Sequence, residues 1–186
     1  MDIREIIERQ RQTYLKQLTK FYSDRTTGAK EILLELNGDE KERTFKLYRL
    51  DYYEQVEGEG KPREFGADTY LNHQPTKYKF GQLSIELNPF FWHGCDFVFN
   101  QELTDIDWLL SWAKKWIDEE DKKPTGTNGL SGVIHNVTRP ASTTDNETKF
   151  SVDFGSADTD SVMELIETIE KQGIKKLKIG SFEMIG

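Results

Sequence analysis

Apolar side chains near the start of the chain recur with the spacing of a helix. Within residues 2–23 they form one narrow stripe, which Gln10 interrupts and which charged residues surround. The stripe consists of Ile3, Ile7, Tyr14, Leu18 and Phe21. This spacing predicts an amphipathic helix. A stripe this narrow either anchors one edge of the helix to its own domain or docks on a second subunit.

The segment that follows alternates apolar and polar residues, as strands do. Residues 29–36 and 43–56 predict two strands, and Asn37-Gly38 between them is a strong signal for a tight hairpin turn. After Leu47 the apolar positions of the second strand shift from odd to even numbers. A bulge, or burial on both faces of the sheet, would explain that shift.

A loop and two further strands are expected next. The residues around Pro62 break the second strand, and 61–76 reads as a loop-rich crossing. Residues 77–87 predict one strand, because apolar and polar side chains alternate up to Leu87. Residues 95–99 predict the strand after it.

A strand followed by an acid-led helix occurs twice, 53 positions apart. Phe97 aligns with Phe150, and Asp105 aligns with Asp158. The apolar helix positions also align without gaps, Leu109, Trp112, Ala113 and Trp116 against Val162, Leu165, Ile166 and Ile169. The repeat predicts two related units of strand and helix. The acids in these units therefore need a structural explanation before a catalytic one.

The remaining elements follow a polar linker at 122–129. They are a strand at 130–139, a turn at 141–147, a strand at 149–154, a helix at 158–172 capped by Gly173, and a strand at 174–184. We expect an N-terminal helix at 1–26, a first α+β half at 27–121 and a second ββαβ half at 130–186, within one domain. The expected fold class is α+β, with a mainly antiparallel sheet, helices packed on one face, and two related halves sharing a core.

Composition restricts the classes of partner. The chain has 186 residues, a net charge of −8 and a single cysteine, Cys95. A negative field repels phosphate backbones and attracts basic surfaces, so we expect a protein partner with a basic surface and no nucleic acid. No run approaches the roughly 18 apolar residues of a membrane span, and the first residues do not form a secretory signal. We therefore expect no membrane association and a cytoplasmic location.

Three adjacent aromatic residues, Phe90, Phe91 and Trp92, lie between two predicted strands. Loops normally run on the surface, and aromatic anchors dominate binding hot spots. The segment is therefore a candidate partner-binding site. The alternative is that the loop folds back and caps the open end of the core.

Trp108 and an acidic run complete the candidate partner-binding surface. Trp108 aligns with Ser161 in the repeat, so we expect it to be partly exposed. The acidic run consists of Asp118, Glu119, Glu120 and Asp121. Negative charge at the C-terminal end of a helix opposes the helix dipole, so its placement there points to a partner. A second acidic stretch, between Phe150 and Glu170, is typical of a solvated helix face.

Two Asp-x-Asp pairs, Asp105/Asp107 and Asp158/Asp160, offer oxygen ligands of the kind that Mg2+ prefers. Both pairs lie where a predicted helix begins, and carboxylates there accept hydrogen bonds from free backbone N–H groups. Thr104 and Asp107 also have the spacing of a capping box. Residues i and i+2 of a helix point apart. We therefore interpret the pairs as helix caps, and we expect no metal and no cofactor.

Four residues are candidates for a small enzyme or ligand-binding site: His73, His93, Cys95 and His135. They match no zinc or nucleophile motif, and no catalytic residue is predicted. A His93–Cys95 pair is one interpretation. The other is that Cys95 packs as a small apolar side chain.

The pattern favours a non-catalytic, acidic protein-binding protein. An immunity or inhibitor protein that occludes a basic toxin fits, because charge steers such a complex and a few aromatic anchors hold it. The alternative is a small enzyme whose site is assembled from distant residues. A third hypothesis is a homodimer formed through residues 1–26.

Overall fold

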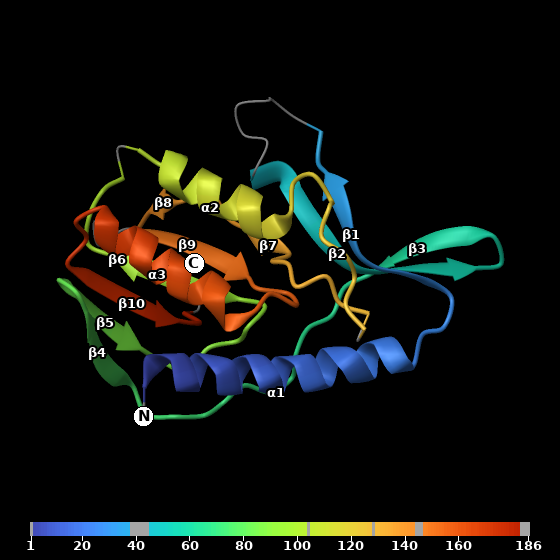
Figure 1. Ribbon diagram of the computed structural model, residues 1–186, viewed down its shortest axis with the longest axis horizontal. Coiled ribbons are helices and arrows are strands. Elements are labelled where there is room, and N and C mark those ends of the chain that lie inside the picture. The colour runs from blue at the N-terminus through green and yellow to red at the C-terminus, as the bar shows by residue number, and fades with distance from the viewer. Residues whose placement is uncertain (1, 38–44, 104, 128, 144–146, 183–186) are drawn as a thin grey trace.

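Helices and two β-sheets combine in an α+β fold (Figure 1). The computed structural model describes residues 2–37, 45–103, 105–127, 129–143 and 147–182. Its helices are α1 (Ile3–Ser23), α2 (Asp107–Ile117) and α3 (Thr159–Lys171). A three-stranded antiparallel sheet consists of β1 (Gly28–Glu35), β2 (Leu47–Val56) and β3 (Glu59–Arg63). A seven-stranded sheet consists of β4 (Thr76–Phe80), β5 (Leu83–Leu87), β6 (Cys95–Phe99), β7 (Asn136–Val137), β8 (Ala141–Ser142), β9 (Thr148–Asp153) and β10 (Lys176–Gly180). The predicted fold class is confirmed.

The large sheet has the strand order β4-β5-β10-β6-β9-β7, with β8 also paired to β9. β10 runs parallel to β5, and the other pairs are antiparallel. The elements β6-α2-β7-β9-α3-β10 therefore have the topology of a split β-α-β motif. The sheet takes strands from both predicted halves, 27–121 and 130–186.

The sequence repeat has a structural counterpart at the centre of this motif. β6 and β9 are neighbours, and their antiparallel register places Phe97 opposite Phe150. The two rings stack with centroids 5.2 Å apart and planes 6° apart. The residues that align in the sequence thus face each other across the sheet, as an approximate two-fold axis between the two strand–helix units requires.

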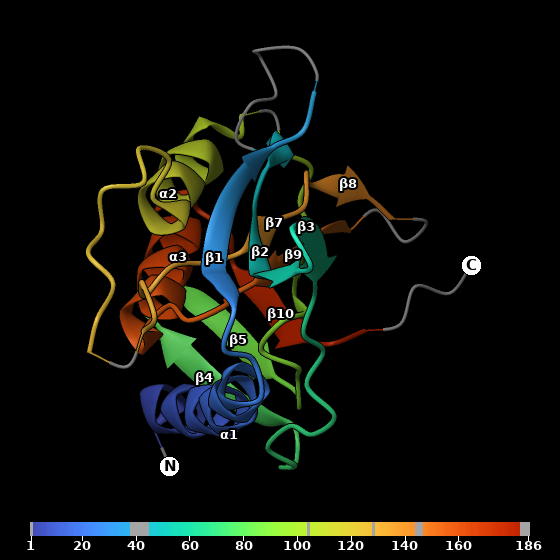
Figure 2. The same cartoon turned by 90° about the vertical axis from the view of Figure 1, so that its right-hand side faces the viewer.

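The α2 and α3 helices lie side by side on one face of the large sheet (Figure 2). Their apolar stripes are buried, as the helical periodicity predicts: Leu109, Trp112, Ala113, Trp116, Val162, Leu165, Ile166 and Ile169. The opposite face of the sheet carries mainly polar side chains. Alternation along β9, where Phe150 and Val152 are buried and Lys149 and Ser151 are partly exposed, shows this division.

The N-terminal helix α1 is packed within its own chain. It runs from the β4 edge of the large sheet to the small sheet (Figure 1). Its inward face is buried against the core: Ile3, Ile6, Ile7, Gln10, Tyr14, Leu18 and Tyr22. The apolar stripe that predicted this helix is therefore already covered inside one molecule, with Gln10 Oε1 accepting from the Leu71 N–H at 2.5 Å.

Two strand predictions were wrong, each for its own physical reason. Residues 77–87 form a hairpin, since Gly81 adopts a positive φ of 56° and reverses the chain between β4 and β5. The expected break around Pro62 contains strand β3, which pairs with β2. Proline is compatible with β3 because that strand lies at the edge of its sheet. At 77–87 the alternation was visible but the turn was not, whereas Glu59–Arg63 has no apolar alternation that would indicate an edge strand.

Other predicted segments are shorter than expected or lie outside the described residues. The strand expected at 130–139 is reduced to β7. Before it, Gly132 has a positive φ of 67°, and the backbone of His135 bonds singly to Asp153 of β9 and Arg49 of β2. The shift of apolar positions in the second strand corresponds to burial of Leu50, Asp51 and Tyr52 together. The turn at Asn37-Gly38 and the Thr104 cap include residues that the structure does not describe.

Candidate functional site

An open groove lies between the outward face of α3, the first turn of α1 and β4. It has a volume of about 610 Å³. Its lining residues are Arg4, Phe80, Asp160, Met163, Glu164, Glu167, Thr168 and Lys171, and we call it the acidic groove. The half-buried Phe80 and Met163, which pack against the core, are its apolar side chains, and three carboxylates project from the rigid helix α3.

The carboxylates of the acidic groove are paired within the chain. Asp160 lies 2.6 Å from Arg4, and Glu167 lies 2.7 Å from Lys171. Glu164 lies 2.5 Å from Lys115 of α2. Exposed ion pairs of this kind stabilise a fold by about 0–1 kcal/mol. A basic side chain of another molecule can therefore replace Arg4, Lys115 or Lys171 as the partner of these carboxylates with a small loss of folding free energy.

A second constellation is buried between the two sheets. His135 is 1 % exposed, and its Nε2 lies 3.0 Å from Oε1 of Glu31 in β1. On the other side of the ring, Nδ1 lies 3.1 Å from Oδ1 of Asp51 in β2, although this contact is not aligned as a hydrogen bond. The backbone N–H of His135 donates to the carbonyl of Asp153 in β9 at 2.8 Å. We call these four residues the histidine cluster.

Burial and charge shift the pKa values of the histidine cluster. Burial alone would lower the pKa of His135, but Asp51, Glu31 and the charge of Asp153 outweigh burial and raise the pKa to about 10. Burial would raise the pKa of Glu31, but the hydrogen bond with His135 holds that pKa below its ordinary value. Burial of the carboxyl raises the pKa of Asp153 to about 7, although the charge of His135 acts to lower that pKa. The residue as a whole keeps some exposed surface.

Local backbone geometry builds the histidine cluster. Glu31 has a left-handed φ of 50° inside β1, an uncommon conformation for a residue other than glycine. Gly155 packs against the imidazole, and a Cβ at that position would lie 2.1 Å from Cδ2 of His135. Tyr14 and Tyr22 from α1 close the remaining side, and burial raises the pKa of both hydroxyls.

The four residues considered for an enzyme site do not come together. In the described part of the chain, none of them hydrogen-bonds to another. His73 Nδ1 lies 2.8 Å from the Gln74 carbonyl, and His93 stacks on Tyr14 with ring centroids 6.1 Å apart. Cys95 is fully buried in the core, and burial raises its thiol pKa well above the ordinary value. Neither the acidic groove nor the hollow described next contains any of the four.

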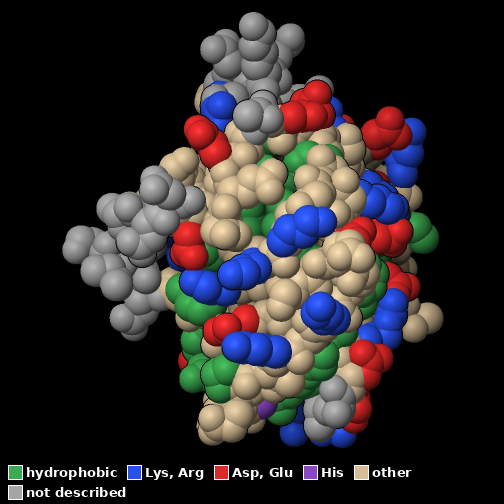
Figure 3. Space-filling view, turned by 90° about the vertical axis from the view of Figure 1, so that its left-hand side faces the viewer, with side chains coloured by type: hydrophobic (Ala, Val, Ile, Leu, Met, Phe, Trp, Pro, Cys, Tyr) green, Lys and Arg blue, Asp and Glu red, His purple; other side chains and the backbone are tan. Residues whose placement is uncertain are grey.

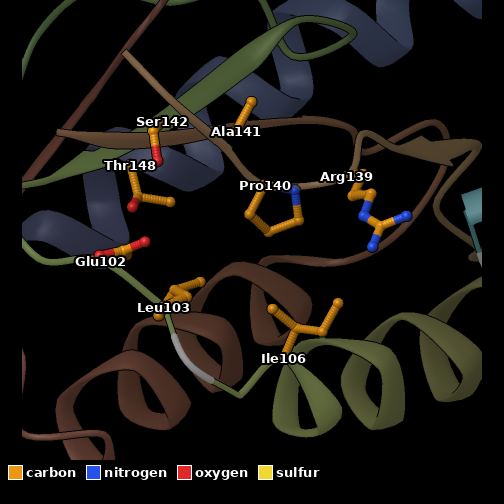
Figure 4. A pocket seen from close by; sticks show the side chains of 8 residues that line it. All are labelled: Glu102, Leu103, Ile106, Arg139, Pro140, Ala141, Ser142 and Thr148. Carbon is orange, nitrogen blue, oxygen red and sulfur yellow. The ribbon is translucent and has the colours of Figure 1, made fainter. Parts of the chain in front are cut away.

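A smaller hollow of about 260 Å³ lies where β8 faces the segment before α2 (Figure 4). Its lining residues are Glu102, Leu103, Ile106, Arg139, Pro140, Ala141, Ser142 and Thr148. Glu102 and Arg139 lie at opposite ends of it. The Thr148 hydroxyl donates to the Gln101 carbonyl at 2.7 Å, so it is already bonded within the chain. These groups do not converge on one point as catalytic groups do.

The aromatic segment 90–92 is mostly internal. Phe90 is 2 % exposed and Trp92 is fully buried, with its Nε1 donating to the Gly155 carbonyl at 3.0 Å. Their burial favours the alternative that this loop caps the core. Phe91 keeps some exposure and packs against Tyr70, which is 41 % exposed, with ring centroids 4.7 Å apart. Trp108 is half-buried, and its Nε1 donates to the Asp105 carbonyl at 3.1 Å.

The acidic run after α2 has partners within the chain. Asp118 Oδ2 accepts from the Lys123 N–H at 2.7 Å and lies 3.7 Å from the guanidinium of Arg49. Asp121 accepts from Arg49 at 2.9 Å. The other two acids pair with neighbouring lysines, Glu119 with Lys114 and Glu120 with Lys122. Their unfavourable position in the helix dipole therefore has an intramolecular explanation.

The Asp-x-Asp pairs take part in helix capping. Asp105 Oδ1 accepts from the Asp107 N–H at 2.8 Å. Asp158 is the N-cap of α3, and its Oδ1 accepts from the Asp160 and Ser161 N–H groups at 3.0 and 3.3 Å. Within the described ranges, no group of three or more His, Cys, Asp or Glu side chains is arranged to hold a metal ion.

Sequence reasoning missed the residues that accompany His135 and the apolar part of the acidic groove. Glu31, Asp51 and Asp153 are far apart in the sequence, and no local spacing joins them. The one available signal was the position of His135 within the apolar run Val133–Val137. That run indicates burial, and a buried histidine needs polar partners.

The helices of the described segments lack the combination of length and apolar character that crossing a bilayer requires. No protein-family model matches the chain, and no curated protein or solved structure shows significant similarity to it.

Proposed function

We propose that this chain is a non-catalytic protein-binding protein that covers a basic surface of its partner with the acidic groove. One observation carries the proposal: three carboxylates on α3 stand beside the apolar side chains of Phe80 and Met163. Apolar contact supplies affinity, and surrounding charge supplies steering and selectivity. The net charge of −8 adds a long-range attraction for a basic partner.

The proposal includes an inhibitor role of the kind that immunity proteins have toward toxins, and a cytoplasmic location. A binding face built on a helix that is packed on a sheet is already ordered before it meets its partner. Such preorganisation lowers the entropic cost of association. Three members of the histidine cluster, His135, Glu31 and Asp51, are buried, and the cluster is interpreted as part of the scaffold.

The test starts from capture of partners with the tagged chain in extracts of the native cell. A purified partner is then titrated at low and high salt. The double variant Glu164→Gln/Glu167→Gln should weaken binding by about tenfold or more, which corresponds to about 1.4 kcal/mol. The matched control Glu57→Gln/Glu59→Gln removes two exposed charges from the β2–β3 hairpin and should leave the affinity unchanged.

Three results would contradict the proposal. The first is a partner whose contact surface is acidic, and the second is an affinity that does not respond to salt. The third is equal loss of affinity in the groove variant and the hairpin control, which would show a net-charge effect without a site. If the partner is an enzyme, an equimolar amount of this chain should abolish its activity, and the groove variant should restore that activity.

A further inference from the structure

The outer edge of β4 exposes hydrogen-bonding backbone groups. β4 is the terminal strand of the large sheet, and within the described residues only β5 pairs with it. A two-residue turn joins the strands, so the closing pair Phe80–Leu83 is a hydrogen-bonded pair. By alternation, Lys77 and Lys79 direct their N–H and C=O groups away from the sheet.

The two faces beside this edge differ in chemistry. On the helical face, Phe80 of β4 lines the acidic groove with Glu164 and Glu167. On the opposite face, Lys77 and Lys79 are exposed, and among the described residues they have no ion-pair partner. Figure 3 shows Lys and Arg side chains gathered on the side of the molecule where β4, β5 and β10 lie. One edge strand therefore separates an acidic, partly apolar face from a face where lysines predominate and Glu86 of β5 stands opposite Lys77.

The charges along this edge disfavour a second copy of the chain as its occupant. Two β4 strands side by side would bring Lys77 and Lys79 of one molecule close to the same lysines of the other, and like charges across strands are destabilising. The edge of the small sheet is protected differently. Pro62 in β3 stands opposite Tyr53 of β2 at a position that pairs no backbone groups with β2, so its missing N–H removes an outward donor.

We infer that β4 is a strand-addition site for an extended segment of a partner protein in which basic or apolar residues alternate with acidic ones. Side chains of a strand point alternately to its two faces. The basic and apolar set would enter the acidic groove, and the acidic set would lie beside Lys77 and Lys79. Main-chain hydrogen bonds supply affinity in this mode, and the alternate side chains supply specificity. This inference rests on the proposed function, because it specifies the shape of the segment that the groove receives.

Synthetic peptides test the inference without knowledge of the natural partner. The probe is a short fluorescent peptide in which glutamate alternates with isoleucine and arginine, and its control has the same composition in a shuffled order. The alternating peptide should bind about tenfold more tightly. Methylation of its edge-facing amides should remove that advantage, since a methylated amide can no longer donate a main-chain hydrogen bond to β4. Equal affinity of the alternating, shuffled and methylated peptides would overturn the inference.

Amide hydrogen exchange locates the contact. Bound alternating peptide should slow exchange at Lys77 and Lys79 by about tenfold or more, whereas Tyr78, which already bonds to β5, should change little. A charge swap gives an independent readout. The Lys79→Glu variant should bind a peptide with lysine in place of glutamate more tightly than the original peptide. Because Lys79 stands opposite Ser84, the substitution creates no like-charge pair with β5. Lys16→Glu on α1 is the matched control and should keep the original preference.

Failure of strand addition can be distinguished from failure of the proposed function. If the natural partner loses affinity for the Glu164→Gln/Glu167→Gln variant but leaves the Lys77 and Lys79 amides unprotected, the acidic groove is correct and strand addition is wrong. If the natural partner and the peptide both bind that variant with unchanged affinity, the groove itself is not the binding site, and both proposals are wrong.

Discussion

At the scale of single residues, His135 connects the two sheets. Its ring lies between Glu31 and Asp51 of the small sheet, and its backbone bonds to Asp153 of the large sheet. The left-handed backbone at Glu31 costs of order 1–3 kcal/mol. Two hydrogen bonds of the Glu31 carboxyl offset that cost. One oxygen bonds to His135, and the other accepts from the Ser131 N–H at 2.6 Å.

The histidine cluster predicts how stability depends on pH. His135 has a pKa raised to about 10, so the stability it contributes is fully present below about 6.5 and is lost as the pH rises toward 10. Asp153 has a pKa raised to about 7, so the unfolded chain ionises first, and stability falls between about pH 4 and 7. For both groups, the contribution to the free energy of unfolding is therefore larger at low pH than above the pKa of the group in the folded protein.

Asp153→Asn separates the two contributions, because the amide keeps the acceptor for the Gly155 N–H and cannot ionise. The free energy of unfolding, measured by urea titration, should match the wild type near pH 4 and exceed it at pH 8. The decline between pH 7 and 10 should persist in the variant, since His135 is still present. A wild-type minus variant difference that does not change from pH 4 to 8 would show that the Asp153 pKa is not raised.

At the scale of elements, Arg49 joins β2 to the end of α2. Its guanidinium donates to the Ile117 and Asp118 carbonyls at 2.7 and 3.0 Å, where the last carbonyls of a helix lack internal partners. It also donates to the Glu31 carbonyl at 2.8 Å, and Asp121 lies beside it. The acids after α2 thus surround a cation that β2 supplies, which the sequence of the helix alone does not reveal.

Arg49→Lys tests this connection. Lysine keeps the charge but cannot reproduce the planar set of donors, so buried carbonyls lose partners. We expect a loss of roughly 2–4 kcal/mol in the free energy of unfolding, from one or two buried charged hydrogen bonds. Arg63→Lys, which changes the exposed pair with Glu54, is the matched control and should cost less than about 0.5 kcal/mol. Equal effects of the two substitutions would refute the role assigned to Arg49.

At the scale of the whole molecule, α1 unites the two sheets into one core. Tyr14 packs on Phe65 and His93, and Tyr22 packs on Tyr52 of β2 and donates to the Asp51 carbonyl at 3.0 Å. At its other end, Arg4 pairs with Asp160 of α3. The helix therefore contacts the small sheet near its C-terminal end and α3, which covers the large sheet, near its N-terminal end, and we expect the two sheets to unfold together.

Deletion of residues 1–26 should prevent cooperative folding. Ile7, Tyr14 and Leu18 are fully buried, and burial of each such side chain contributes about 1.5–3 kcal/mol. The free energy lost with these side chains, together with the cost of the apolar surface that their removal exposes, is comparable with the 5–15 kcal/mol that stabilises a typical domain. Circular dichroism and dye binding should show an expanded chain with exposed apolar surface. A truncated chain that unfolds cooperatively and changes only from dimer to monomer would instead support the homodimer hypothesis.

Local patterns in the sequence determined the helices and most of the strands. The stripe of α1, the apolar positions of α3, Gly173 after α3 with its φ of 77°, and the alternation in β9 all depend on neighbours a few residues away. The repeat also identified Phe97 and Phe150 as equivalent. These features follow from helix and strand periods, which are properties of the chain itself.

Only the tertiary structure decided what the polar residues do. Trp92 is buried because it packs on Phe154 and donates a hydrogen bond to the Gly155 carbonyl. Asp118 and Asp121 have a partner within the chain because β2 places Arg49 beside them. Glu31, which bonds to His135, lies 104 residues away from it in the sequence. The acidic groove forms because α3 packs beside β4. A periodicity states which face of an element is buried. It does not state which distant element covers that face, and contacts between distant elements set the charge and shape of this protein's surface.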